Sequence, residues 1–142
     1  MLPSNRSIPG GVIIPELAYE DVRQAADWLC AAFGFTLRLE IGNHRAQLVF
    51  GDGAIVVTQR TRTNPGPAPE RQHAVMVRIE NLEGHHARAV QHGAKIVRPP
   101  ADHPYGERQY TAEDLGGHVW TFSQTIADSD PASWGGKLHP SA

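Results

Sequence analysis

The sequence presents the same order of patterns twice, and this internal repeat constrains the fold more than any single motif does. Each copy contains an apolar run, a helical pattern that ends at a glycine, and three further strand-like runs. Two copies of one small unit can face each other across a cleft, so the repeat also indicates where a functional site would lie. The corresponding segments are residues 12–18, 21–34, 37–41, 45–50 and 54–59 in the first copy, and residues 74–79, 81–93, 95–98, 107–112 and 118–124 in the second.

Local signals support these assignments. Asp21 can cap a helix whose apolar residues recur at three- and four-residue spacing, and Gly34 suits the left-handed turn that ends it. The alternation of Leu37, Leu39 and Ile41 with polar residues predicts a half-buried strand. The second helix begins after Glu80 or Asn81 by the same reasoning.

The repeat divides the chain into four parts. Residues 12–60 form a first β-α-β-β-β module and residues 73–124 a second, with a linker at 61–72 that contains three prolines and one glycine. Residues 125–142 are expected to form a mostly irregular tail that Trp134 ties to the surface. We therefore predict an α+β fold, in which tandem modules form a curved mixed sheet around a cleft and the helices lie outside.

Composition narrows the functional classes. A net charge of −2 over 142 residues, with both signs mixed along the chain, predicts no nucleic-acid partner. The chain has no apolar run of about 18 residues and no secretory leader pattern, so we expect no membrane partner. A single cysteine, Cys30, suits a reducing compartment, and we expect a cytoplasmic protein.

Two segments carry a family resemblance. Residues 105–122 end in Asp114-Leu115-Gly116-Gly117 and an aromatic last strand, and the first helix leaves through Phe33-Gly34-Phe35. With both copies, these segments resemble the vicinal oxygen chelate superfamily, also called the glyoxalase/bleomycin resistance/dioxygenase family. The resemblance implies a homodimer and leaves the activity open, because the family's fold hosts isomerases, dioxygenases, thiol transferases and drug-binding proteins.

The resemblance also implies four metal-ligand positions, which members with a metal fill mainly with His or Glu. These positions fall on Ile14, Gln47, Ala74 and Thr121, none of which is His, Asp, Glu or Cys. We therefore predict no metal site and no cofactor. A non-standard site with displaced ligands, such as His44 or His73, stays open as an alternative.

Strand parity predicts what lines the cleft. If Val75, Val77 and Trp120 pack under the helices, the opposite face carries the candidate ligand-binding residues Glu16, Gln47, Arg78 and Thr121. The loop and strand beside the mouth add three more candidates, Tyr105, Arg108 and Tyr110.

This mixed lining suits a medium-sized organic molecule held by shape and a few polar anchors. We predict a metal-free protein of the glyoxalase/bleomycin resistance/dioxygenase type that binds or sequesters a small molecule, as drug-resistance members do. The alternative is an enzyme of the same superfamily, either a metal-dependent lyase, isomerase or dioxygenase with non-standard ligands, or a metal-free isomerase that uses Glu16.

Overall fold

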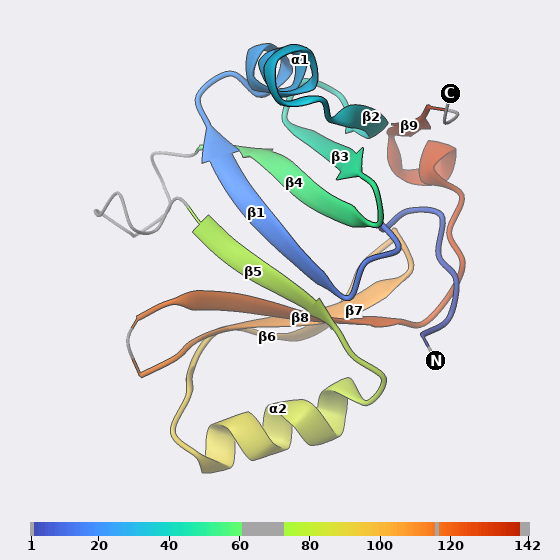
Figure 1. The fold of residues 1–142 in the computed structure, drawn as a ribbon. Helices are drawn as coiled ribbons and strands as arrows, with labels where there is room; N and C mark the ends of the chain where they lie inside the picture. The colour runs from blue at the N-terminus through green and yellow to red at the C-terminus, as the bar shows by residue number, and fades with distance from the viewer. Residues whose placement is uncertain (1, 61–72, 116, 140–142) are drawn as a thin grey trace.

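The computed structural model describes residues 2–60, 73–115 and 117–139, so the predicted linker at 61–72 lies outside the described residues. The described chain forms one nine-stranded mixed sheet that curves strongly, with both helices on its outer side (Figure 1). This arrangement confirms the predicted α+β class.

The first repeat starts its helix with the predicted cap. The Asp21 side chain accepts a hydrogen bond of 3.0 Å from the backbone N–H of Gln24, and Gly34 ends the helix at φ 81°. Asp21 thereby satisfies one of the helix's free N–H groups. The elements are β1 (Ile13–Tyr19), α1 (Val22–Phe33), β2 (Thr36–Ile41), β3 (Arg45–Phe50) and β4 (Gly53–Gln59).

The second repeat has the same order of elements. Asn81 caps its helix by accepting a hydrogen bond from the Gly84 N–H. The elements are β5 (His73–Arg78), α2 (Leu82–Gln91), β6 (Lys95–Asp102), β7 (Glu107–Glu113) and β8 (Val119–Thr125). No helix among the described residues is long and apolar enough to cross a membrane.

Strand β6 is longer than the sequence predicted, because it continues through Pro99 and Pro100 to Asp102. Proline cannot donate a ladder hydrogen bond, but β6 is the edge of the sheet and needs partners on one side only. Its pairing with β7 shifts register between Ile96 and Arg98 and again between Arg98 and Ala101. With these two register shifts, β6 stays paired with β7 on both sides of Pro99 and Pro100.

The two repeats join edge to edge. The strand order is β6-β7-β8-β5-β1-β4-β3-β2-β9, and β1 pairs with β5 in antiparallel register, with Pro15 opposite Val75. An approximate twofold axis through that pair relates Glu16 to Met76. It follows from the neighbouring registers that the axis also relates Val56 to Thr121 and Gln47 to Thr111.

Each helix covers its own half of the sheet with an apolar cluster. Val22, Ala26 and Leu29 of α1 pack on Ala46, Leu48 and Val57, and Leu82 of α2 packs on Tyr110 and Ala112. A third cluster lies on the inner side and consists of Ile8, Ile14, Val56 and Met76. Apolar burial therefore fixes both faces of the sheet, and each strand has to keep its parity.

The segments before β1 and after β8 run together along the open side of the curved sheet (Figure 1). We call residues 2–11 the N-terminal arm. The Asn5 side chain accepts hydrogen bonds from the N–H groups of Ser7 and Ser129, and the Trp134 ring N–H donates to the Ser7 hydroxyl. The tail, expected to be irregular, contains a 3₁₀ turn, η2 (Pro131–Trp134), and strand β9 (Gly136–Leu138), which pairs with β2.

Two glycines with the same backbone geometry should respond differently to alanine. Gly93 and Gly106 have φ 84° and 82°, but a Cβ at Gly106 would lie 2.3 Å from the Ala127 carbonyl oxygen, whereas one at Gly93 meets no atom within 4 Å. We predict that Gly93→Ala lowers the free energy of unfolding by about 1 kcal/mol, the cost of left-handed backbone alone. Gly106→Ala should cost about 3 kcal/mol or more, because the close approach to the tail is lost as well.

Urea unfolding of both variants measures the difference. Equal destabilisation by the two substitutions would contradict the close contact between the Gly106 turn and the tail.

Candidate functional site

The curved sheet encloses a cavity of about 570 Å³ on its inner side, between the two repeats. Both repeats contribute strands to its wall, so the cavity forms within one chain. The N-terminal arm closes one end, and the tail contributes Trp134 and Gly135. The lining residues are Ser7, Ile8, Pro9, Glu16, Ile41, Gly42, His44, Arg45, Gln47, Val56, Met76, Arg98, Pro104, Tyr105, Glu107, Gln109, Thr111, Thr121, Trp134 and Gly135.

An ion pair lies on the wall formed by the first repeat. Glu16 on β1 and Arg45 on β3 approach to 3.3 Å, and their side chains are 13% and 33% exposed. Parity directs both side chains inward from strands that are separated by β4. The pair leaves this wall polar but without net charge.

Gln47 is held by Arg38 and by the N-terminal arm. Its side-chain oxygen accepts a hydrogen bond from Arg38, and its amide N–H donates to the Ser7 carbonyl of the arm at 2.9 Å. Burial lowers the pKa of Arg38, and the nearby charge of Arg78 lowers it further. Gln47 therefore positions the arm as well as lining the cavity.

Glu107 lies at the base of the cavity and is fully buried. Its carboxylate accepts hydrogen bonds from Asn5 at 2.7 Å and from the hydroxyl groups of Ser123 and Thr125 at 2.6 Å each. Gln109 in turn donates to the Ser123 hydroxyl at 2.9 Å. The carboxylate thus links the arm to β8, and both of its oxygens are engaged.

Aromatic rings form the wall next to the tail. Tyr105 stacks on His103, with ring centroids 5.0 Å apart, and contacts Trp134 at 5.2 Å. Its hydroxyl donates to the Gln109 side chain at 3.0 Å. Burial raises the pKa of Tyr105, while the positive charges of Arg45 and Arg98 act in the opposite direction. Tyr105 is therefore a neutral donor whose hydroxyl group is already committed.

The structure brings together four of the residues expected at the site. Glu16, Gln47, Tyr105 and Thr121 all line the cavity. Thr121 and its neighbour Thr111 place their hydroxyl oxygens 3.3 Å apart.

Arg78, Arg108 and Tyr110 were expected at the site, but they do not line the cavity. Arg78 has the inward parity, but the arm covers it, and the guanidinium donates to the carbonyls of Pro3 and Pro9 and to the Thr125 hydroxyl. Arg108 and Tyr110 lie on the outer face of β7, where Arg108 pairs with Asp102 at 2.6 Å. Tyr110 is 1% exposed beneath α2 and shares a hydrogen bond with His85.

Comparison with known proteins settles the family. The model of the glyoxalase/bleomycin resistance protein/dioxygenase superfamily matches residues 13–122. The chain belongs to this superfamily. The match confirms the resemblance seen in the sequence, and no match to a functionally curated protein is found.

Solved structures of the superfamily share the fold. A member from Vibrio splendidus 12B01 has a TM-score of 0.61 at 15% identity and covers 80% of this chain and 97% of its own. Methylmalonyl-CoA epimerase from Mycobacterium tuberculosis has a TM-score of 0.65 at 17% identity and covers 89% and 94%. At these identities the likeness shows the fold alone. TioX from Micromonospora sp. ML1 is 35% identical over 82% of this chain and 100% of its own, with a TM-score of 0.37.

The side chains in the cavity do not fit the metal site known from other superfamily members. Gln47 and Thr121 line the cavity, whereas Ile14 is fully buried in the inner apolar cluster and Ala74 has no donor atom. Among the described residues, no three His, Cys, Asp or Glu side chains come together as metal ligands. Donors engage both oxygens of Glu107, and Arg45 engages one oxygen of Glu16, so these two carboxylates leave a single oxygen for a metal ion, which is too few to hold it.

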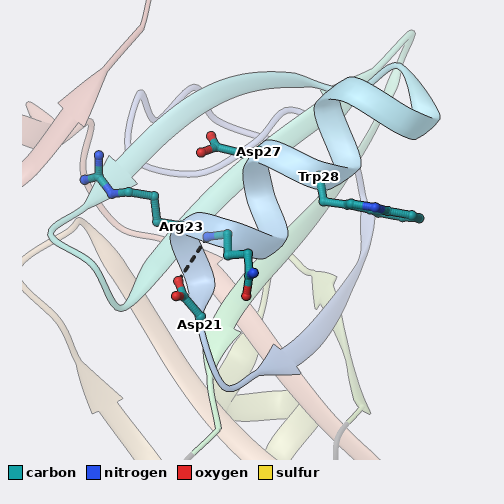
Figure 2. A pocket seen from close by; sticks show the side chains of 5 residues that line it. Asp21, Arg23, Asp27 and Trp28 are labelled. Carbon is teal, nitrogen blue, oxygen red and sulfur yellow. Dashed lines mark hydrogen bonds between the residues drawn. The ribbon is translucent and has the colours of Figure 1, made fainter.

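A second hollow lies on the outer face of α1 and is shown in Figure 2. All of its lining residues are exposed: Asp21, Arg23, Gln24, Asp27 and Trp28. It therefore lacks the enclosure of the inner cavity, from which the sheet separates it. The inner cavity is the candidate site of this superfamily member.

Several lining residues were not expected from the sequence. Strand parity could have identified Gln109 and Thr111, because they alternate with Tyr110 and Ala112, which pack under α2. Arg98 ends the predicted strand at 95–98, but the register shifts on either side of it break the alternation that would have shown which face it takes. The arm residues Ser7 to Pro9 have no periodic pattern that would place them.

The buried carboxylate provides a stability test. Glu107→Gln keeps the shape of the side chain but removes the charge that accepts three hydrogen bonds, and it turns an N–H group towards donors. We predict a loss of about 2 kcal/mol in the free energy of unfolding. Glu20→Gln is the matched control, since the Glu20 side chain is 86% exposed and its ion pair with Arg60 is long, at 3.8 Å.

Urea denaturation at neutral pH gives both values. If Glu107→Gln is as mild as Glu20→Gln, the Glu107 network does not hold the arm and β8 together.

Proposed function

We propose that this protein binds and sequesters a small organic molecule in the inner cavity, without using a metal ion. The observation that carries the proposal is a concave space of about 570 Å³ in which Glu16 pairs with Arg45, Tyr105 donates to Gln109, and the Thr111 and Thr121 hydroxyl groups contact each other. Ligand pockets typically measure about 300–1,000 Å³ and combine apolar walls with a few fixed polar groups. Ile8, Val56 and Met76 supply the apolar floor.

Pre-arranged polar groups favour binding because little ordering remains when a ligand enters. Gln47, Gln109 and Tyr105 are fixed by partners in the protein, so their positions do not depend on the ligand. This organisation suits recognition by shape. It does not require any residue to change its charge during binding.

A thermal-shift screen of small aromatic and heterocyclic compounds tests the proposal. A ligand present at 100 times its Kd stabilises the folded state by about 2.7 kcal/mol, which corresponds to a rise in Tm of roughly 8 °C. Thr121→Phe places a ring in the cavity and should abolish the rise for every hit. Thr36→Phe, at an exposed position of β2, is the control and should leave the rise unchanged.

Hits that stabilise the Thr121→Phe variant as strongly as the parent protein would place binding elsewhere. A broad library without any hit would count against a binding function altogether.

A second candidate function is proton transfer by Glu16 without a metal ion. The hydrogen bond from Arg45 engages only Oε1 of Glu16, whereas both oxygens of Glu107 are engaged by donors. Glu16 is thus the cavity carboxylate with an oxygen available to accept a proton from a bound C–H acid.

Solvent deuterium exchange separates this function from binding alone. If Glu16 is a base, screening hits with an acidic C–H group should take up deuterium from D₂O in the presence of the protein, and Glu16→Gln should stop the uptake while binding persists. NMR of the recovered ligand measures the exchange. Uptake that survives Glu16→Gln, or no uptake in the parent protein, would rule out this role.

A further inference from the structure

The charged groups in the cavity, two of each sign, do not all pair with one another. Four fully charged side chains line it: Glu16, Arg45, Arg98 and Glu107. Glu16 and Arg45 neutralise each other at 3.3 Å. Glu107 is 0% exposed and is surrounded by three donors, so its charge is not available to a ligand. Arg98 is the charge that remains.

Arg98 lies where a ligand could reach it. It sits on β6 opposite Thr111, whose hydroxyl group contacts Thr121 on the cavity wall. The residue is exposed, and within the described ranges its side chain has no carboxylate partner. The neighbouring cations on the same sheet differ, because Lys95 pairs with Glu113 and Arg108 pairs with Asp102.

Arg98 lines the same cavity as the aromatic wall formed by Tyr105 and Trp134. The polar tips of that wall are already satisfied: Tyr105 donates to Gln109, and the Trp134 ring N–H donates to Ser7 at 2.7 Å. What the wall offers a ligand is therefore ring surface, which binds planar groups by stacking.

We propose that the ligand of this cavity is a planar aromatic acid, whose ring packs on Tyr105 and Trp134 and whose anionic group binds the Arg98 guanidinium. This inference rests on the proposed binding function and adds the charge and shape of the ligand. A guanidinium presents a fork of N–H donors that matches a carboxylate, and Arg98 is the accessible charged group of the cavity without a partner among the described residues.

Four probes of similar size test the charge and the ring separately: 2-naphthoate, 2-naphthylmethanol, 2-naphthylmethylamine and the saturated acid decahydro-2-naphthoate. Isothermal titration calorimetry should show 2-naphthoate binding at least about tenfold more tightly than the neutral alcohol, with the amine weakest. Decahydro-2-naphthoate should bind more weakly than 2-naphthoate, because it has the same carbon skeleton but lacks the flat aromatic face.

Arg98→Gln should lower the affinity for 2-naphthoate by about tenfold and leave the affinity for the alcohol unchanged within a factor of two. The matched control is Arg108→Gln, which removes a cation on the outer face of the sheet and should change neither affinity. The naphthoate affinity of the parent protein should also fall with added salt, and that of the alcohol should not.

Tighter binding of the alcohol or the amine overturns the inference, as does an Arg98→Gln variant that retains the preference for naphthoate. Either result leaves the binding function intact, because a ligand still enters the cavity. Failure of all four probes also overturns it. The thermal-shift screen then tests the proposed binding function by itself. Hits that are neutral or positively charged would support it, and a screen without hits would count against it.

Discussion

The antiparallel pairing of β1 with β5 is the constraint on which the rest of the structure depends. These two strands carry the backbone hydrogen bonds that join a four-stranded half and a five-stranded half into one sheet. The same register sets Ile14 beside Met76 and Glu16 beside Ala74 on the inner wall. A slip of one residue would turn the inner residues of one of the two strands, Glu16 or Met76, towards the helices, so the cavity depends on this register.

The arm and the tail complete what the sheet leaves open. Arg38, Arg78 and Gln47 all donate hydrogen bonds to carbonyl oxygens of the arm, which has few backbone partners of its own. These donors include two guanidinium groups close enough for one charge to lower the pKa of the other. Burying these polar side chains would be unfavourable if they lacked hydrogen-bond partners. The carbonyl oxygens of the arm supply those partners, and the hydrogen bonds hold the arm in place as the end wall of the cavity.

The periodic spacing of apolar residues predicted most of the fold, because the long helices and strands contain enough residues for the pattern of each buried face to be recognised. Asp21, Gly34 and Asn81 marked the helix ends for the same local reasons that operate in the structure. Parity also placed Glu16, Gln47 and Thr121 correctly on the inner side of the sheet. It succeeded where a strand had apolar residues on one face to fix its orientation.

The remaining features had no such signal. Strand β9 spans three residues, too few to show an alternation, and the arm adopts its path through side chains that lie 40 or more residues away, such as Gln47 and Arg78. Arg78 had the expected parity, but only the folded arm shows that it is covered. Tyr110 was expected to line the cavity. It packs beneath α2 instead, so its neighbours Gln109 and Thr111 are the β7 residues that face the cavity.

The approximate twofold axis relates positions that carry unlike groups. Glu16 corresponds to Met76, Val56 to Thr121 and Gln47 to Thr111. Two identical halves would offer a ligand two equivalent poses, related by a half-turn. Here the half-turn exchanges an ion-paired carboxylate for a thioether and an amide for a hydroxyl, so the two poses differ in energy. The duplicated architecture has in this way become a cavity with two unlike ends, which can distinguish one end of a bound molecule from the other.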